Sequence, residues 1–273
     1  MTLAIVSAMR QELSALLGCL EGAQVVHAGG RAFHRGRLAG REVVLVLSGI
    51  GKVAAAATAS LLIDRFHARS LLFTGVAGGL GLGVKVGDVV VATALLQHDL
   101  DVSPLFPRWE VPLTGRSRFE ADAHLCKALA RACDQVLARP HPGLASLGLH
   151  APQRHLGLVV SGDRFVSSAT ESAALRAALP DALAVEMEGA AMAQVCADFA
   201  CPLGVLRTVS DRADDSAHVD FGRFVDEVAA EYSRDVVLTA LAGGLGLPGA
   251  AGTSGTSGTS GTSGTSGASG TPG

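Results

Sequence analysis

The feature that most constrains the fold is an alternation between short β-branched runs and longer stretches rich in alanine and leucine. The short runs have the length and composition of buried strands, and they occupy residues 3–7, 43–48, 70–75, 88–95, 155–162, 183–187 and 203–210. The longer stretches carry apolar side chains at helical spacing and predict helices over 9–19, 52–67, 119–138, 169–178, 189–200 and 221–242. A hairpin is predicted from residues 24–29 and 32–38. This alternation indicates a layered α/β domain.

Periodic hydrophobicity stops near residue 242. From Gly243 onward the chain becomes a Gly-Thr-Ser repeat, which has nothing to bury and predicts a disordered tail. We therefore expect one folded domain over residues 1–242 and a disordered Gly/Thr/Ser-rich tail over 243–273.

Composition and charge narrow the classes of partner. The formal net charge is −3 and charged residues make up 17% of the chain, which gives no electrostatic case for binding nucleic acid. Neither a signal peptide nor an apolar run long enough to cross a bilayer is present in the sequence. The five cysteines contain no CxxC pair, which favours buried free thiols in a reducing compartment. These features predict a cytoplasmic protein that binds a small molecule.

Several well-known chemical motifs are missing or incomplete. The glycine-rich "TGVAGGLGLG" and "SGIGK" segments do not match a P-loop or a dinucleotide fingerprint. There is no G-x-S-x-G elbow for a nucleophilic serine. "HDLD" at 98–101 has no second cluster at metal-ligand spacing, so neither a metal nor another cofactor is expected.

Acids, serines and glycines instead follow the predicted strands, where ligands of α/β folds collect. Glu12 follows the first strand, and "SGDRF" and "SDRAD" follow the strands ending at 162 and 210. In "AVEMEGAAMA", Glu186 and Glu188 flank Met187 among apolar neighbours. Locally these acids fit either a solvated turn or a ligand site, because a carboxylate in apolar surroundings is costly unless it is paired.

Taken jointly, the strand-end motifs resemble those of the purine nucleoside phosphorylase/hydrolase superfamily. They are "SAMRQE", "SGIGKVAAA", "TGVAGGL", "VGDVVVA", "VSGDRFV", "AVEMEGAAMA" and "RTVSDRAD". Their order and spacing over about residues 1–241 are most similar to the 5'-methylthioadenosine/S-adenosylhomocysteine nucleosidases. The resemblance implies a three-layer α/β/α sandwich around a mixed, twisted central sheet. It also implies a homodimer in which the neighbouring subunit helps to close the pocket.

The resemblance also assigns the chemistry. These enzymes hydrolyse the N-glycosidic bond between adenine and a 5'-thio-substituted ribose. Asp211 matches the acid that protonates adenine N7, and Ser210 the residue that orients it. Glu12 matches the residue that holds and deprotonates the attacking water.

The remaining site residues follow from the same motifs. Glu188 matches the acceptor for both ribose hydroxyls, and Met187 the side chain lying against the ribose. Glu186, with Arg207, matches either a further acid near the sugar or a structural ion pair. The base side of the pocket is implied to comprise Phe165 stacking on adenine, the backbone of Val166, and the backbone around Ala77 and Gly78.

Two departures from the family pattern leave questions open. Val76 stands where the bacterial nucleosidases carry serine, so a hydroxyl that would help to fix the water or sugar is absent. Residues 101–119 replace the segment that shapes the 5' end of the pocket. Its aromatic side chains, Phe106, Trp109 and Phe119, suit an apolar 5'-substituent. Its arginines, Arg108, Arg116 and Arg118, suit a charged 5'-substituent.

Two other functions stay open from the sequence. One is phosphorolysis on the same scaffold, although Glu12 is poorly suited to lie beside a phosphate anion. The other is a non-catalytic nucleoside-binding or sensor protein, suggested by Val76 and the 101–119 segment.

Overall fold

The computed structural model describes residues 2–147, 149, 151–213 and 224–245. The first three residues of the helix predicted over 221–242, Asp214 of the "SDRAD" motif and nearly all of the predicted tail lie outside these residues.

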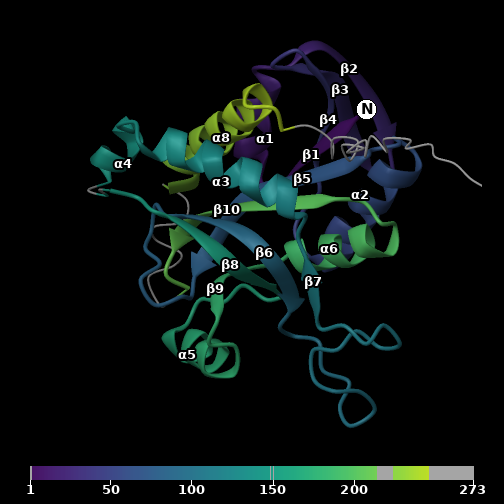
Figure 1. The fold of residues 1–273 in the computed structure, drawn as a ribbon, viewed down its shortest axis with the longest axis vertical. Helices are drawn as coiled ribbons and strands as arrows, with labels where there is room; N and C mark the ends of the chain where they lie inside the picture. Colours follow the sequence, from purple (N-terminus) through teal and green to yellow (C-terminus); the bar gives the residue numbers. More distant parts are fainter. Residues whose placement is uncertain (1, 148, 150, 214–223, 246–273) are drawn as a thin grey trace, which may run out of the picture.

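A ten-stranded mixed sheet forms the centre of the molecule (Figure 1). The order across it is β10-β6-β8-β9-β5-β1-β4-β3-β2, and β7 pairs with β6. β10 also pairs with β5, so that β5, β9, β8, β6 and β10 form a closed ring of paired strands. In chain order the strands are β1 (Leu3–Ser7), β2 (Glu21–Ala28), β3 (Arg31–Leu38), β4 (Arg41–Leu47), β5 (Ser70–Gly79), β6 (Val89–Gln97), β7 (Arg118–Glu120), β8 (Arg154–Ser161), β9 (Ala182–Glu186) and β10 (Leu203–Asp211).

The strand pairing brings several carboxyl ends together. β1 runs parallel to β4 and β5, and β5 runs parallel to β10. β5 is longer than predicted, and its last residues, Gly78 and Gly79, pair with Val185 and Ala184 of the antiparallel β9. The carboxyl ends of β1, β5, β9 and β10 therefore meet in one region.

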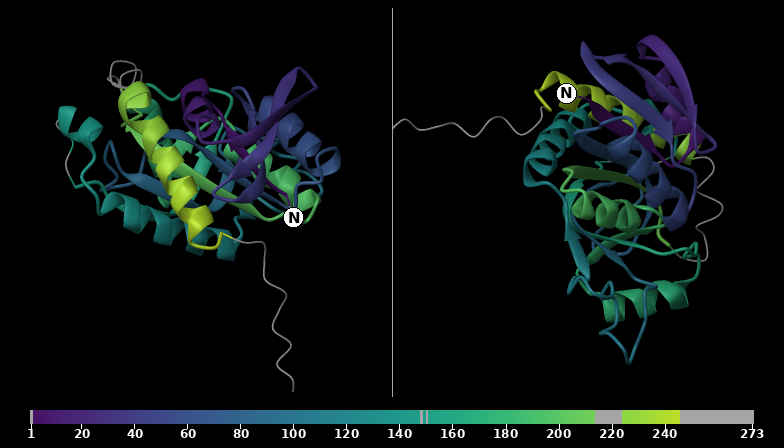
Figure 2. Two further views of the ribbon diagram at one scale, coloured as in Figure 1. Left: turned by 90° about the horizontal axis from the view of Figure 1, so that it is seen from above. Right: turned by 90° about the vertical axis from the view of Figure 1, so that its right-hand side faces the viewer.

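Helices cover both faces of the sheet, which confirms the predicted layered architecture. On one face α1 (Arg10–Leu17) and α3 (Ala123–Leu137) pack against α8 (Ala230–Ala242), which follows a π-helical turn at Val225–Ala229. On the other face α2 (Lys52–Asp64) packs against α6 (Gly189–Asp198). The two views of Figure 2 show α8 next to α3, against which it packs. The short α4 (Pro142–Ser146) and α5 (Ala169–Ala178) lie toward the edges of the molecule (Figure 1).

Each face of the sheet has its own apolar core, as expected for a layered domain. One core joins Val44 and Phe73 of the sheet to Leu62 of α2 and Met192 of α6. The other joins Ile5 of the sheet to side chains of α1, α3 and α8. No helix among the described residues is long and apolar enough to cross a bilayer.

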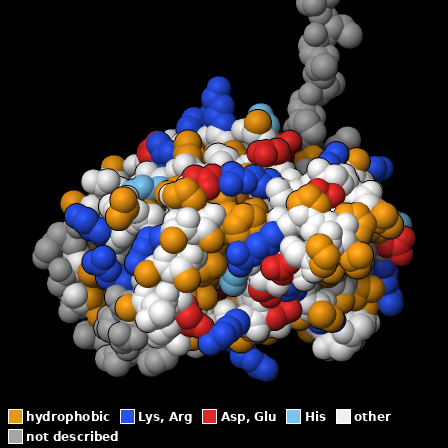
Figure 3. Space-filling view, turned by 90° about the horizontal axis from the view of Figure 1, so that it is seen from below, with side chains coloured by type: hydrophobic (Ala, Val, Ile, Leu, Met, Phe, Trp, Pro, Cys, Tyr) orange, Lys and Arg blue, Asp and Glu red, His pale blue; other side chains and the backbone are white. Residues whose placement is uncertain are grey.

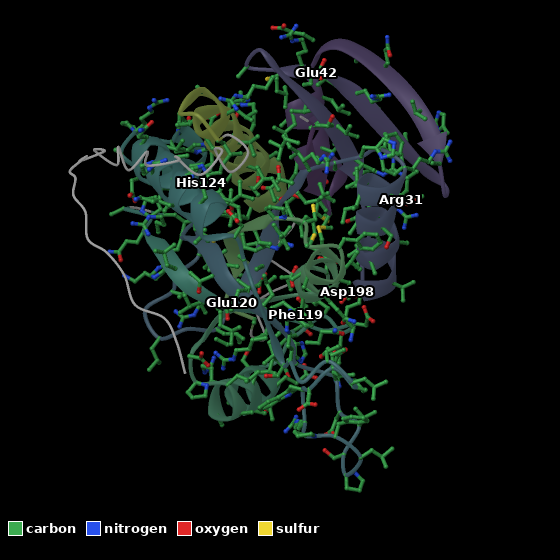
Figure 4. All side chains as sticks on the ribbon, turned by 45° about the vertical axis from the view of Figure 1, so that its right-hand side comes forward. Arg31, Glu42, Phe119, Glu120, His124 and Asp198 are labelled. Carbon is green, nitrogen blue, oxygen red and sulfur yellow. The ribbon has the colours of Figure 1, made fainter. Side chains whose placement is uncertain are left out.

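The predicted helix over 119–138 begins later than expected. Phe119 lies in β7, where it pairs with Leu95 of β6, and α3 starts only after Asp122. The Asp122 carboxylate accepts a hydrogen bond of 2.8 Å from the Leu125 amide, the usual arrangement of a helix N-cap. Figure 4 shows Phe119 beside Glu120 on this short strand. Phe119 is buried in the core between the sheet and α6 and is thus not available to a 5'-substituent.

The segment between β6 and β7 projects away from the body of the molecule (Figure 1). Two of the arginines predicted for the 5' end of the pocket, one in this segment and one at the start of β7, are engaged on the surface. Arg108 lies 3.7 Å from Asp101, and Arg118 lies 2.6 Å from Asp181 of the loop before β9.

Candidate active site

The meeting carboxyl ends of β1, β5, β9 and β10 enclose a pocket of about 620 Å³, counting the space at its open mouth. All the residues predicted to catalyse or to bind the base and the ribose line it, except Glu12 and Arg207. None of the six side chains of residues 101–119 that were considered for the 5' end of the pocket lines it. The predicted residues that do so are Val76, Ala77, Gly78, Phe165, Val166, Glu186, Met187, Glu188, Ser210 and Asp211. The structure thus brings together residues that lie more than a hundred positions apart in the chain.

Glu186 and Arg207 form a buried ion pair behind the pocket wall. Arg207 Nη2 donates to Glu186 Oε2 at 2.7 Å, and the Arg207 side chain is fully enclosed. Its guanidinium also lies 4.0 Å from the centre of the Phe73 ring, a cation–π contact. A side chain at Gly75 would bring its Cβ to 3.2 Å from Nη1. Glycine at this position therefore lets the guanidinium pack against the strand.

The Glu186 carboxylate is also held by other donors of the protein. It accepts hydrogen bonds from the Ser161 hydroxyl and from the amides of Glu188 and Gly189, the latter at 2.8 Å to Oε2. The amide donors come from the start of α6, where a negative charge is favoured by the helix dipole. With Arg207 added, both carboxylate oxygens are engaged by the protein. Glu186 is thus part of a buried ion pair and also lines the pocket.

Glu188 lies at the N-cap position of α6 and faces the pocket. Its Oε1 accepts a 2.9 Å hydrogen bond from the Gly51 amide at the start of α2. Burial, and next the negative charge of Glu186, raise the pKa of the Glu188 carboxyl to about 7 against the opposing attraction of Arg207. This carboxylate thus has fewer protein donors than Glu186 and can accept hydrogen bonds from a ligand.

Glu12 is completely buried on α1 and does not line the pocket itself. Its neighbours Ala8 and Met9 form that part of the wall. Neither Glu12 oxygen makes a hydrogen bond of good geometry within the described residues. Burial raises the pKa of Glu12 to about 7, against the attraction of Arg207. Such a carboxyl can take up or release a proton near neutral pH.

Asp211 is the last residue of β10 and lines the pocket. Ser210 Oγ donates to its Oδ2 at 2.8 Å, and the Ala213 amide donates to its Oδ1 at 2.7 Å. Both contacts fix the orientation of the carboxyl group toward the pocket. A Cβ at Gly78 would lie 3.0 Å from Asp211 Oδ1 and 2.8 Å from the Cβ of Ala213. Glycine at position 78 therefore leaves room for this arrangement.

The rest of the pocket wall is largely apolar. Phe165 keeps 44% of its surface exposed, although it is a large hydrophobic side chain, and Met187 and Val166 line the same pocket. Lining residues that the sequence did not single out are Ala8, Met9, Ile50, Arg164 and Val185. Most of them are small or apolar and carry no chemical signal, although all five lie within the motifs that carry the family resemblance.

Residues 2–147, 149, 151–213 and 224–245 contain no group of three or more histidine, cysteine, aspartate or glutamate side chains able to hold a metal ion. The only basic side chain that lines the pocket among them is Arg164, which is exposed and lies 2.5 Å from Glu171. Acids and apolar side chains thus dominate the described wall. The site suits a ligand with hydroxyl donors and a flat apolar ring.

Fold and site together define the class of protein. The family model of the phosphorylase superfamily matches residues 2–242, and the chain belongs to this superfamily.

Solved structures narrow the class further. One is the 5'-methylthioadenosine/S-adenosylhomocysteine nucleosidase of Neisseria meningitidis in complex with methylthio-immucillin-A, with 39% identity over 89% of this chain and 99% of that chain and a TM-score of 0.78. Another is the corresponding nucleosidase of Colwellia psychrerythraea in complex with adenine. It has 34% identity over 88% of this chain and 94% of that chain, and a TM-score of 0.80. A third, from Streptococcus pneumoniae with a transition-state inhibitor, has 34% identity over 89% of this chain and 99% of that chain, and a TM-score of 0.78. Within the superfamily, the chain belongs to this family of nucleosidases.

Proposed function

We propose that the protein hydrolyses the N-glycosidic bond of 5'-methylthioadenosine, S-adenosylhomocysteine or a related 5'-deoxyadenosine and releases adenine. The observation that carries this proposal is that Asp211 and Glu188 line one largely apolar pocket, with Glu12 fully buried close to its lining residues Ala8 and Met9. Membership of the nucleosidase family supports it independently.

In this proposal Asp211 is the general acid. Departure of adenine as an anion is unfavourable, and a proton from Asp211 to N7 makes the leaving group neutral. Ser210 and the Ala213 amide keep the carboxyl group in place. A positioned acid of this kind contributes roughly 10²- to 10⁴-fold to the rate.

Glu12 is the general base that takes a proton from the attacking water. Its raised pKa of about 7 suits this role, because a catalytic base is most effective when its pKa lies near the working pH. The water must approach from the interior side of the pocket, since Glu12 is buried there. Val76 lines the same pocket and contributes no hydroxyl, so positioning of the water depends on Glu12 and on backbone groups.

Glu188 binds the ribose and Phe165 the base. An ionised carboxylate only accepts hydrogen bonds, and the two ribose hydroxyls only need to donate. Met187 packs against the sugar, while the Val166, Ala77 and Gly78 backbones border the base. Glu186 and Arg207 hold β9, β10 and the start of α6 together.

Hydrolysis is favoured over phosphorolysis by the charges around the pocket. Glu188, Glu186 and Asp211 line it, and Arg164 is the only basic lining residue in the described part of the chain. Arg164 is paired with Glu171, and Arg207, next to the pocket, is paired with Glu186. Arg10 of the "SAMRQE" motif is exposed and lines a separate hollow with Arg31 and Ser48. A phosphate anion in the main pocket would thus meet repulsion without a compensating cation.

The test is incubation with methylthioadenosine in phosphate-free buffer, with both products identified by chromatography. Adenine and free methylthioribose are expected, together with loss of turnover but retained nucleoside binding in Asp211→Asn. Strict dependence on phosphate and formation of a sugar 1-phosphate would show phosphorolysis instead. Tight binding without any release of adenine would favour the sensor alternative.

We further propose that the protein acts as a homodimer. Several large apolar side chains stay exposed at the start of α2 and on the projecting segment, namely Ile50, Val53, Leu105 and Leu113. Hydrophobic patches are also visible on the face seen from below (Figure 3). Multi-angle light scattering should give twice the chain mass.

A cytoplasmic location stays a prediction from the sequence.

A further inference from the structure

Two cysteines meet at the C-terminal end of α6, far from the catalytic acids. The Cys201 amide donates to the Cys196 carbonyl at 2.8 Å, and the Ala200 amide donates to the Ala197 carbonyl at 3.2 Å. Ala200 has a left-handed backbone, with φ of 50°. This combination is the Schellman motif, which brings the side chains of its first and last residues into contact. Here both of those residues are cysteines.

The backbone geometry permits a covalent bond between the two sulfurs. With an amide–carbonyl contact of 2.8 Å, standard bond lengths limit the separation of the two Cα atoms to about 7 Å or less. Disulfides join Cα atoms roughly 4.4–6.8 Å apart. The two thiols are also close enough to shift each other's pKa. We propose that Cys196 and Cys201 are an oxidisable dithiol, which a hydroperoxide converts into an intramolecular disulfide.

The surroundings give the two cysteines different roles. Cys201 lines a hollow of about 570 Å³, open to solvent, together with His67, Arg69 and Phe199. The neighbouring Cys196 thiol lowers the pKa of Cys201 although burial opposes it, and the positive charge of Arg69 adds to the lowering. The neighbouring Cys201 and burial raise the pKa of Cys196. Cys201 is therefore the sulfur that reacts first, since the thiolate is the nucleophile.

The reaction has two balanced steps. The Cys201 thiolate attacks one oxygen of hydrogen peroxide and breaks the O–O bond, giving a sulfenic acid on Cys201 and hydroxide, which takes up a proton to form water. The sulfur of Cys196, on losing its proton, then attacks the sulfenic sulfur. The S–S bond forms as the sulfenic S–O bond breaks, and a second water leaves. Peroxide is reduced by two electrons, and the two thiols lose one electron each.

The other cysteines provide internal controls. Burial raises the pKa of Cys126 to about 11 and that of Cys133 to about 12, which makes both poor nucleophiles. Cys19 is exposed on the opposite layer. Among the described residues, no disulfide joins any of the cysteines.

The experiment treats the full-length protein with hydrogen peroxide, blocks the remaining thiols with iodoacetamide under denaturing conditions, and analyses tryptic peptides by mass spectrometry. A single peptide, residues 177–207, contains both Cys196 and Cys201 and no other cysteine. We expect this peptide to lose two hydrogens and to take up no iodoacetamide, and dithiothreitol to reverse both effects. Its oxidation should be at least about tenfold faster than that of Cys133, which has no thiol partner.

Two variants separate the roles. Cys196→Ser should stop at the sulfenic acid on Cys201, trapped by dimedone, whereas Cys201→Ser should leave Cys196 as slow to oxidise as Cys133. Cys196→Ala repeats the first test without a hydroxyl in the core. Circular dichroism and nucleosidase activity of the reduced variants check that they fold. The proposal is overturned if both thiols remain open to alkylation after oxidation of Cys19, or if Cys201 is overoxidised while Cys196 stays free.

Discussion

Arg207 Nη2 lies 2.7 Å from Glu186 Oε2, in an ion pair whose two side chains are 0% and 3% exposed. The pair connects β10 to β9, and the Glu186 carboxylate also holds the first amides of α6. Asp211 ends β10 and Glu188 starts α6. This single buried contact therefore fixes the relative positions of the proposed catalytic acid and the proposed ribose acceptor.

Replacement of Arg207 by methionine should lower the free energy of unfolding by about 3–5 kcal/mol, because it leaves the Glu186 carboxylate buried without its partner. Urea denaturation followed by circular dichroism measures the loss. Arg118→Met is the matched control. Arg118 also pairs with an aspartate at 2.6 Å but is exposed, so that loss should be within about 1 kcal/mol. Equal losses in the two variants would contradict a structural role for the buried pair.

The activity should fall in acid because Glu12 must lose its proton to act as a base. With a pKa of about 7, kcat/KM should be on a plateau above that pH and decrease steadily below it. The measurement is the initial rate of adenine release across a series of buffers at fixed ionic strength. Glu12→Gln should lose roughly 10²- to 10⁴-fold in kcat. A flat profile down to the ordinary carboxyl pKa of 4.5 would rule out Glu12 as the base.

The same residue should make the protein less stable at alkaline pH. The pKa of Glu12 is about 7 in the folded chain against an ordinary 4.5, so the unfolded state loses this proton first. The contribution that uncharged Glu12 makes to the free energy of unfolding is fully present below pH 4.5 and is lost as the pH rises through 7. Glu12→Gln, which stays neutral, should thus be more stable than the wild type above that range by up to about 3 kcal/mol.

Urea denaturation at two pH values, one above and one below this range, checks the effect. The advantage of Glu12→Gln should disappear at the lower pH. Glu42→Gln, at an exposed carboxylate on β4 (Figure 4), controls for the substitution itself. An advantage of equal size at both pH values would show that packing, and not charge, is responsible.

Much of this site could be predicted from sequence because its residues lie at the ends of strands with strong apolar patterns. The burial of Glu12 and Arg207 behind the lining residues could not be predicted in this way. A motif gives the order of side chains along the chain, but whether one reaches the cavity depends on how α1 and β10 pack around it. The role of Glu186 stayed open for the same reason, since its donors come from β8, β10 and α6. Helical spacing extends through Phe119 and predicts too early a start for α3, whereas the N-cap at Asp122 marks the actual start.

Ser210 should contribute to catalysis through Asp211 without being a catalytic residue itself. Its hydroxyl donates to one Asp211 oxygen at 2.8 Å, while the Ala213 amide holds the other at 2.7 Å. Ser210→Ala should therefore lower kcat by roughly tenfold, the value of about one hydrogen bond, and Asp211→Asn by a much larger factor. Single-turnover rates at saturating substrate measure both. A double variant no worse than Asp211→Asn alone would show that Ser210 acts only through the aspartate.

Phe165 should bind the base at little cost to stability. It lines the pocket with 44% of its surface exposed, so the folded protein gains little from its burial, and a flat ligand ring can cover it. Phe165→Ala should raise KM about tenfold, the value of an aromatic stacking contact, and change the free energy of unfolding by less than about 1 kcal/mol. Phe199→Ala is a suitable control, because Phe199 is 50% exposed and lies in the hollow beside Cys201. If both variants kept the wild-type KM, the adenine ring would have to lie against another wall, and Met9 or Ile50 would be the next side chains to replace.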